Sequence, residues 1–182
     1  YADNAEIYFN EDISTEYRQG DAWAYGLELM LNKTMGRMTG SASYTWSKTM
    51  RTIDGVNRGF EFYSNHDRRN VLNVQAAYDY NDKWIFGATF TYSTGRPLTL
   101  PAGKYEYGDY NPDVLTERNG YRLPAFHRLD LSVTLNPRKN LSRKWKGQWV
   151  FSVYNAYDRR NPFTIYTRTM QDEDGNIIGD GT

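Results

Sequence analysis

Residues 38–47 alternate between two kinds of side chain. Every second residue from position 38 is small or apolar, and the row ends in two large aromatics: Met38, Gly40, Ala42, Tyr44 and Trp46. The positions between them all carry a hydroxyl group: Thr39, Ser41, Ser43, Thr45 and Ser47. A period of two is typical of a β-strand whose faces lie in different surroundings. The pattern therefore predicts a strand over residues 38–49 with one apolar and one polar face.

The same alternation recurs along most of the chain, and no segment has a convincing helical period. The further predicted strands are 23–34, 68–80, 84–94, 126–136 and 147–157. The predicted connections are tight turns at 35–37 and 81–83, a moderate basic turn at 136–146, and long loops at 1–22, 50–67, 95–125 and 158–182. Short turns at one end and long loops at the other are typical of an up-and-down sheet in an outer membrane.

The aromatic content changes the picture of the apolar faces. Tyr, Phe and Trp make 16% of the chain, although its mean hydropathy is strongly polar at −0.80. Large aromatics lie near the ends of predicted strands: Tyr44, Trp46, Tyr78, Tyr80, Trp84 and Tyr92. Such positions fit the aromatic girdles at the two membrane–water interfaces. A soluble β-protein with a Tyr-rich core remains the alternative.

Polar residues in the middle of the predicted strands favour the membrane alternative. They lie on the face opposite the apolar rows: Glu28, Gln75, Asp79, Arg128 and Asp130. In a barrel these side chains point into a wet lumen at little cost.

Charge and cysteine content exclude several function classes. The 22 basic residues balance the 22 acidic ones, so no general affinity for nucleic acid is predicted. The absence of cysteine excludes disulfides, thiolate metal sites and cysteine nucleophiles. No apolar run reaches the length of a transmembrane helix, and Tyr1 opens a polar stretch without a signal peptide.

Four stretches together resemble the C-terminal barrel of TonB-dependent outer-membrane transporters. They are WAYGLELMLNKTMGRMTGSASYTWSKT, NHDRRNVLNVQAAYDYNDKWIFGATFTYSTGRPLTLP, RLPAFHRLDLSVT and SVYNAYDRRNPF. The matching features are a glycine–glutamate strand, an Asp-Arg-Arg strand opening, an aromatic–Ser-Thr-Gly-Arg-Pro exit and an Arg-Leu-Asp-Leu-Ser strand. They occur in the family's order and cover about residues 20–165.

The resemblance implies an antiparallel up-and-down transmembrane β-barrel of 22 strands in the outer membrane of a Gram-negative bacterium. The six predicted strands look like the sixteenth to twenty-first, and the four long loops would be extracellular. The implied function is active import of a scarce ligand, such as a siderophore, cobalamin, an oligosaccharide or a peptide. The implied partners are outer-membrane lipid, the rest of the barrel, a plug domain and the TonB complex, and a surface lipoprotein is compatible with the family.

Several parts of a TonB-dependent transporter are not found in residues 1–182. A plug domain, a TonB-contact segment, the first two-thirds of the barrel and the closing strand with its C-terminal aromatic are all missing from residues 1–182. Six strands with two open edges would leave backbone groups unsatisfied in lipid. We therefore expect the chain to be a fragment of a larger barrel, and a soluble carbohydrate-binding β-sheet module or a passive porin remain as alternatives.

No enzyme is predicted. His66 lies beside Asp67 and Arg68, and His127 lies beside Arg128, but no G-x-S-x-G motif supplies a nucleophile. These charged residues are equally suited to pairing across strands.

No metal or cofactor is predicted either. Asp172, Asp174 and Asn176 have the spacing that opens an EF-hand loop. However, Ile177 stands where that loop needs Gly, and no Glu follows at the twelfth position. A β-turn in a polar surface loop explains this stretch better.

A ligand-binding function is predicted for the loop YEYGDYNPDVLTERNGYR. Its aromatic and cationic side chains could stack on and hydrogen-bond a sugar or similar ligand. The predicted ligand-binding residues are Tyr105, Tyr107, Tyr110, Arg118, Tyr121 and Arg122. The alternative is that these side chains only make contacts between loops above the barrel.

Overall fold

The fold is all-β and antiparallel. The computed structural model describes residues 19–104, 113–115, 117–136, 147–165, 168–171 and 177–181. These residues contain strands and one 3₁₀ turn, η1 (Asn57–Gly59), and no α-helix. None of the described segments is a helix with the length and apolar character needed to cross a membrane. The predicted all-β class is confirmed.

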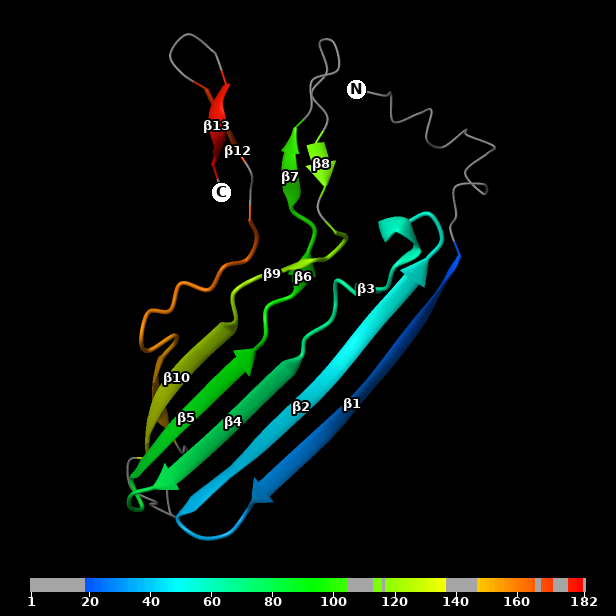
Figure 1. The fold of residues 1–182 in the computed structure, drawn as a ribbon. Coiled ribbons are helices and arrows are strands. Elements are labelled where there is room, and N and C mark those ends of the chain that lie inside the picture. The colour runs from blue at the N-terminus through cyan, green and yellow to red at the C-terminus, as the bar shows by residue number, and fades with distance from the viewer. Residues whose placement is uncertain are drawn as a thin grey trace, which may run out of the picture.

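The main sheet follows the order of the chain. Its six long strands are β1 (Gly20–Lys33), β2 (Met38–Ile53), β4 (Asn70–Asp79), β5 (Trp84–Ser93), β10 (Phe126–Leu135) and β11 (Trp149–Val153). Each pairs antiparallel with its neighbour, and β3 (Phe62–Tyr63) pairs with the far part of β2 (Figure 1). The sheet is open, with β1 at one edge and β11 at the other.

The strand bounds differ from the prediction in several places. β1 begins at Gly20, within the loop predicted at 1–22, and β4 begins at Asn70 instead of residue 68. The two largest differences are at the ends of β2 and β11. The strand predicted at 38–49 continues to Ile53 because β3 supplies partners for Met50 and Arg51. The strand predicted at 147–157 ends at Val153. The regular pairing ends there because Asn155 has a left-handed backbone (φ 55°), and beyond it the chain stays beside β10, where the Ala156 N–H donates to the Leu129 carbonyl.

Two of the predicted long loops contain short hairpins, so they are not wholly irregular. In the loop predicted at 95–125, β6 (Pro97–Leu98) pairs with β9 (Tyr121–Arg122), and β7 (Pro101–Lys104) pairs with β8 (Asp113–Leu115). In the loop predicted at 158–182, β12 (Arg168–Gln171) pairs with β13 (Ile177–Gly181). All of these lie at the end of the sheet opposite the tight turns (Figure 1).

The register places the alternating residues in continuous rows across the sheet. Ala42 lies opposite Leu31 of β1 and Val74 of β4, and the row continues through Phe90 and Leu129. The neighbouring row lies on the other face and is polar throughout: Asn32, Ser41, Gln75, Thr89 and Asp130. The period-two pattern of single strands therefore becomes one apolar and one polar face of the whole sheet.

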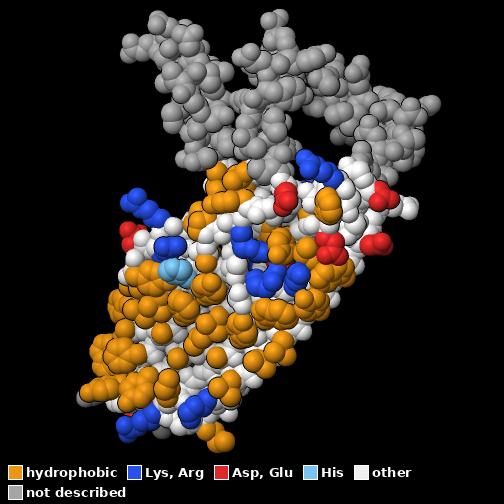
Figure 2. All heavy atoms as spheres, viewed as in Figure 1, with side chains coloured by type: hydrophobic (Ala, Val, Ile, Leu, Met, Phe, Trp, Pro, Cys, Tyr) orange, Lys and Arg blue, Asp and Glu red, His pale blue; other side chains and the backbone are white. Residues whose placement is uncertain are grey.

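The apolar face is the convex one. In Figure 1 the outer strands β1 and β10 fade with distance relative to β2, so the surface toward the viewer bulges outward. Figure 2 shows the same surface covered largely by hydrophobic side chains. Many of them are more than half exposed, including Leu27 at 55%, Leu31 at 72% and Phe151 at 62%.

The described residues form no core beneath the sheet. Their buried hydrophobic side chains are Met50, Phe62 and Leu123. All three lie in or beside the hairpin end of the sheet, and within the described ranges no second layer covers its middle. The architecture is thus a single curved sheet whose packed region is confined to one end.

Candidate ligand site at the hairpin end of the sheet

Asp67 is the centre of the packed region. Asp67 is only 1% exposed and lies in the irregular segment between β3 and β4. The Thr49 backbone N–H donates to Oδ1 over 2.7 Å, and Arg122 Nη2 approaches Oδ2 to 2.6 Å. Arg69 Nη2 lies 3.8 Å from the same oxygen. A buried carboxylate needs such partners, because without them its burial is costly.

Arg122 connects two segments at this end of the sheet: the β2–β3 hairpin with the residues that follow it, and the β6–β9 hairpin. Its Nη1 donates to the backbone carbonyls of Asp67 (3.0 Å) and Gly95 (2.9 Å). Its guanidinium also lies 5.2 Å from the centroid of the Tyr63 ring. These contacts give Arg122 a structural role between the segments 62–67 and 95–123, and its contact with a ligand stays a prediction.

Gly95 follows β5 and lies close to the backbone of Leu123 and Pro124, the residues that lead back into β10. A Cβ added there would lie 2.5 Å from the carbonyl carbon of Leu123 and 2.8 Å from the carbonyl oxygen of Pro124. These are backbone atoms that cannot rotate away, so only glycine fits without displacing the strand.

Gly95→Ala is therefore expected to lower the free energy of unfolding by about 1–3 kcal/mol through overpacking. Denaturant unfolding of the protein assembled in detergent micelles measures this loss. Gly147→Ala is the matched control, because an added Cβ at Gly147 meets nothing within 4 Å. Equal stability of the two variants would contradict the close approach at Gly95.

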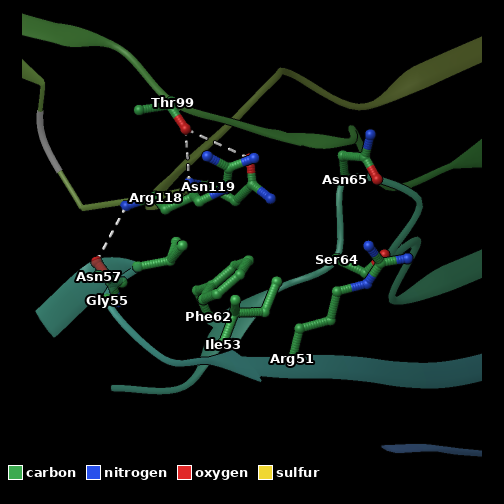
Figure 3. Close-up of a pocket in the computed structure, with 11 residues that line it drawn as sticks. Arg51, Ile53, Gly55, Asn57, Phe62, Ser64, Asn65, Thr99, Arg118 and Asn119 are labelled. Carbon is green, nitrogen blue, oxygen red and sulfur yellow. Dashed lines mark hydrogen bonds between the residues drawn. The ribbon is translucent and has the colours of Figure 1, made fainter. Parts of the chain in front are cut away.

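A hollow of about 590 Å³ lies between the β2–β3 hairpin and the β6–β9 hairpin, beside Asp67 and its partners. One wall comes from β2, β3 and their surroundings, through Arg51, Ile53, Phe62, Ser64 and Asn65. The η1 region contributes Gly55, Val56 and Asn57, and the opposite wall comes from Thr99, Arg118 and Asn119 (Figure 3). Asparagine, threonine, serine and arginine side chains share this lining with the apolar side chains of Ile53, Val56 and Phe62.

Hydrogen bonds fix the wall that carries Arg118. The Asn119 N–H donates to Thr99 Oγ1 over 2.9 Å, and Asn119 Nδ2 donates to the Tyr63 carbonyl over 2.6 Å. The Arg118 N–H donates to Asn57 Oδ1 over 3.2 Å. Asn57 and Asn119 both have left-handed backbones, with φ of 51° and 55°, which asparagine tolerates better than most residues.

The hollow contains an aromatic surface next to a cation. Phe62 is 5% exposed, and the guanidinium carbon of Arg118 lies 5.7 Å from its ring centroid. Arg51 is directly opposite Phe62 in the β2–β3 pair. Arg51 and Arg118 are both exposed and both line the hollow, so each can contact a molecule bound there.

The structure separates the residues predicted to bind ligand. Arg118 lines the hollow, Arg122 belongs to the Asp67 cluster, and Tyr121 lies on β9, 40% exposed and opposite Leu98. Tyr105, Tyr107 and Tyr110 lie outside the described residues.

Sequence reasoning missed most of the lining, including Arg51, Asn57, Phe62, Asn65 and Asn119. The available signals were the turn pairs Asp54-Gly55 and Asn119-Gly120, which mark where each hairpin bends beside an arginine.

The histidines show no catalytic arrangement in the described part of the chain. His127 Nδ1 lies 2.7 Å from the Tyr157 hydroxyl, and the His66 backbone N–H lies 3.5 Å from Ser64 Oγ. Residues 19–104, 117–136 and 147–165 contain no cluster of three or more acidic or histidine side chains suited to a metal. The calcium-like spacing at residues 172–176 lies outside the described residues.

Charged residues on the polar face pair with each other. Arg128 Nη2 lies 2.9 Å from Asp130 Oδ2, and Asp130 Oδ1 accepts the Asn155 N–H over 2.9 Å. Arg128 also donates to the Tyr154 hydroxyl and stacks 3.9 Å from the centroid of that ring. These contacts hold the turn after β11 against β10.

Comparisons with protein-family models, with curated proteins and with solved structures give no match. The resemblance to TonB-dependent transporters therefore rests on the sequence motifs alone.

Proposed function

We propose that the chain is part of the wall of an outer-membrane active-transport barrel of the TonB-dependent receptor kind. The observation that carries the proposal is the single curved sheet with a largely apolar, exposed convex face. Strands of 10 to 16 residues in β1, β2, β4, β5 and β10 are long enough to cross a bilayer when tilted. Lipid would cover the apolar face, and the polar face would line a water-filled interior.

The open edges of the sheet support a larger barrel. Among the described residues, no strand pairs with the outer side of β1 or of β11, and lipid cannot satisfy the backbone groups on those sides. The remainder of the same barrel is the natural partner for both edges. On the family plan, a plug would fill the interior, the TonB complex would supply energy through that plug, and a surface lipoprotein could cover the hairpin end. The chain itself would contribute no catalysis.

A soluble β-sheet binding module is the second candidate. It would need another layer over the apolar face, supplied from outside the described residues or by association. The observation in its favour is the hollow of about 590 Å³, which a binding module would also use.

Detergent dependence separates the two candidates. We expect the protein to fold only in detergent or lipid, because in water the convex face exposes side chains such as Leu31 and Phe151. Circular dichroism and sedimentation with and without detergent measure this. A monomeric, cooperatively folded protein in detergent-free buffer would overturn the transport proposal.

A passive porin is distinguished by its energy requirement. Uptake of the ligand is expected to stop in a strain that lacks TonB if the proposal holds. Uptake that continues unchanged in that strain would identify a passive pore.

A further inference from the structure

We propose that the hollow between the two hairpins binds a small anion through carboxylate or phosphate oxygens, with Arg51 and Arg118 as the anchoring cations. This inference rests on the proposed transport function, since it names the ligand class that the outer end of the barrel would capture. Its support is independent of the membrane argument, because it depends only on the lining of the hollow.

The first observation is the charge of the lining. Arg51 and Arg118 are both part of it, and it contains no Asp or Glu. Polar neutral side chains complete it, among them Asn57, Asn65 and Asn119. A concave, half-open surface with two cations and no carboxylate in its lining attracts anions, and the amide N–H groups add hydrogen-bond donors.

The second observation is that neither of these two arginines pairs with a carboxylate in the described residues. Arg69, Arg122 and Arg128 each approach a carboxylate within 4 Å. In the described ranges, no ion pair joins Arg51 or Arg118 to a carboxylate. Two guanidinium groups that line one hollow without a paired carboxylate leave their charges available to an anionic ligand.

The carboxylates nearest in sequence lie outside the lining of the hollow. Glu61 accepts the indole N–H of Trp23 over 2.9 Å. Asp54 and Glu117 flank the lining in sequence, are absent from it, and have interactions of their own.

The geometry of Arg118 favours a planar or bidentate group. Its backbone is fixed through Asn57, and its guanidinium lies near the face of Phe62, which is itself buried. A guanidinium held in this way can present parallel N–H groups to two oxygens of one carboxylate or phosphate. Phe62 then offers an apolar surface to the carbon skeleton of the ligand.

Calorimetric titration of the full-length protein tests the inference with two anionic probes and one neutral probe. The anionic probes are tricarballylate and glucose 6-phosphate, and the neutral probe is glucose. Saturable binding of at least one anion without binding of glucose is expected. The tighter of the two anions identifies carboxylate or phosphate as the preferred group.

Arg51→Gln and Arg118→Gln are each expected to weaken that binding about tenfold or more, since each removes charge-assisted hydrogen bonds. Arg58→Gln is the matched control, because Arg58 lies in η1 next to the lining residue Asn57, is exposed and does not itself line the hollow. It should change the affinity less than about twofold if binding depends on the two anchors rather than on general charge.

Two results would overturn the inference. One is no saturable binding of either anion up to about 10 mM, and the other is an equal loss of affinity in all three variants. Neither result bears on the membrane proposal, which detergent dependence tests separately. If the protein instead proves soluble, the same titration in plain buffer still tests the hollow.

Discussion

Ala42→Arg is expected to prevent most of the protein from assembling in the outer membrane. Ala42 lies in the middle of the apolar face, between Leu31 of β1 and Val74 of β4. An arginine there would place a guanidinium against the hydrocarbon near the bilayer midplane, at a cost of about 2–4 kcal/mol. The folded fraction in the outer membrane, measured by resistance to unfolding in unheated detergent samples, reports this loss.

Ser43→Arg is the matched control, because the change in volume and charge is nearly the same one residue away. Ser43 lies between Met30 and Asn73 on the opposite face, where an arginine side chain can extend into water. This variant is expected to assemble almost as well as the parent protein. If the two variants assembled equally, the assignment of the two faces would be wrong.

Asp67→Ala is expected to lower the free energy of unfolding by about 3 kcal/mol, the largest loss for any single substitution at the hairpin end. The change would remove the partner of Arg122 Nη2 and of the Thr49 N–H together. Because Asp67 is buried, water cannot fully replace these interactions. Denaturant unfolding in micelles gives the global loss, and hydrogen exchange shows whether it centres on residues 47–69 and 95–123.

Asp82→Ala provides the reference for that variant. Asp82 is exposed in the tight turn between β4 and β5, at the other end of the sheet. Its removal should change stability by less than about 0.5 kcal/mol. A loss below 1 kcal/mol for Asp67→Ala would show that the Asp67 cluster does not hold the hairpins together.

The sheet was predictable because one physical signal dominates it. Each long strand has one face with few polar groups and one with few apolar groups, so a period of two is visible even in a single sequence. Tight turns at Asn81-Asp82-Lys83 and near Gly36 then fix which strands are neighbours, and the register follows from the shared faces. The strand order and the two faces therefore follow from local patterns.

The candidate site was predictable only in part because its contacts are distant in sequence. Asp67 and Arg122 are 55 residues apart, and nothing in either local sequence indicates that they meet. Arg118 was found because it lies in a conspicuous aromatic and basic loop, whereas Arg51 lies beyond the predicted end of its strand. Whether Arg122 binds ligand or supports the hairpin depends on the fold and not on its residue type.

The most direct test of the central claim is the environment of each side chain along residues 38–47. The chain contains no cysteine, so a single cysteine at each position can carry a nitroxide label without removing others. Electron paramagnetic resonance in lipid bilayers then compares collisions with oxygen, which concentrates in lipid, and with a water-soluble nickel complex. We predict oxygen accessibility at positions 38, 40, 42, 44 and 46 and nickel accessibility at the five positions between them. Uniform nickel accessibility, or the opposite alternation, would contradict the proposal that lipid covers the apolar face.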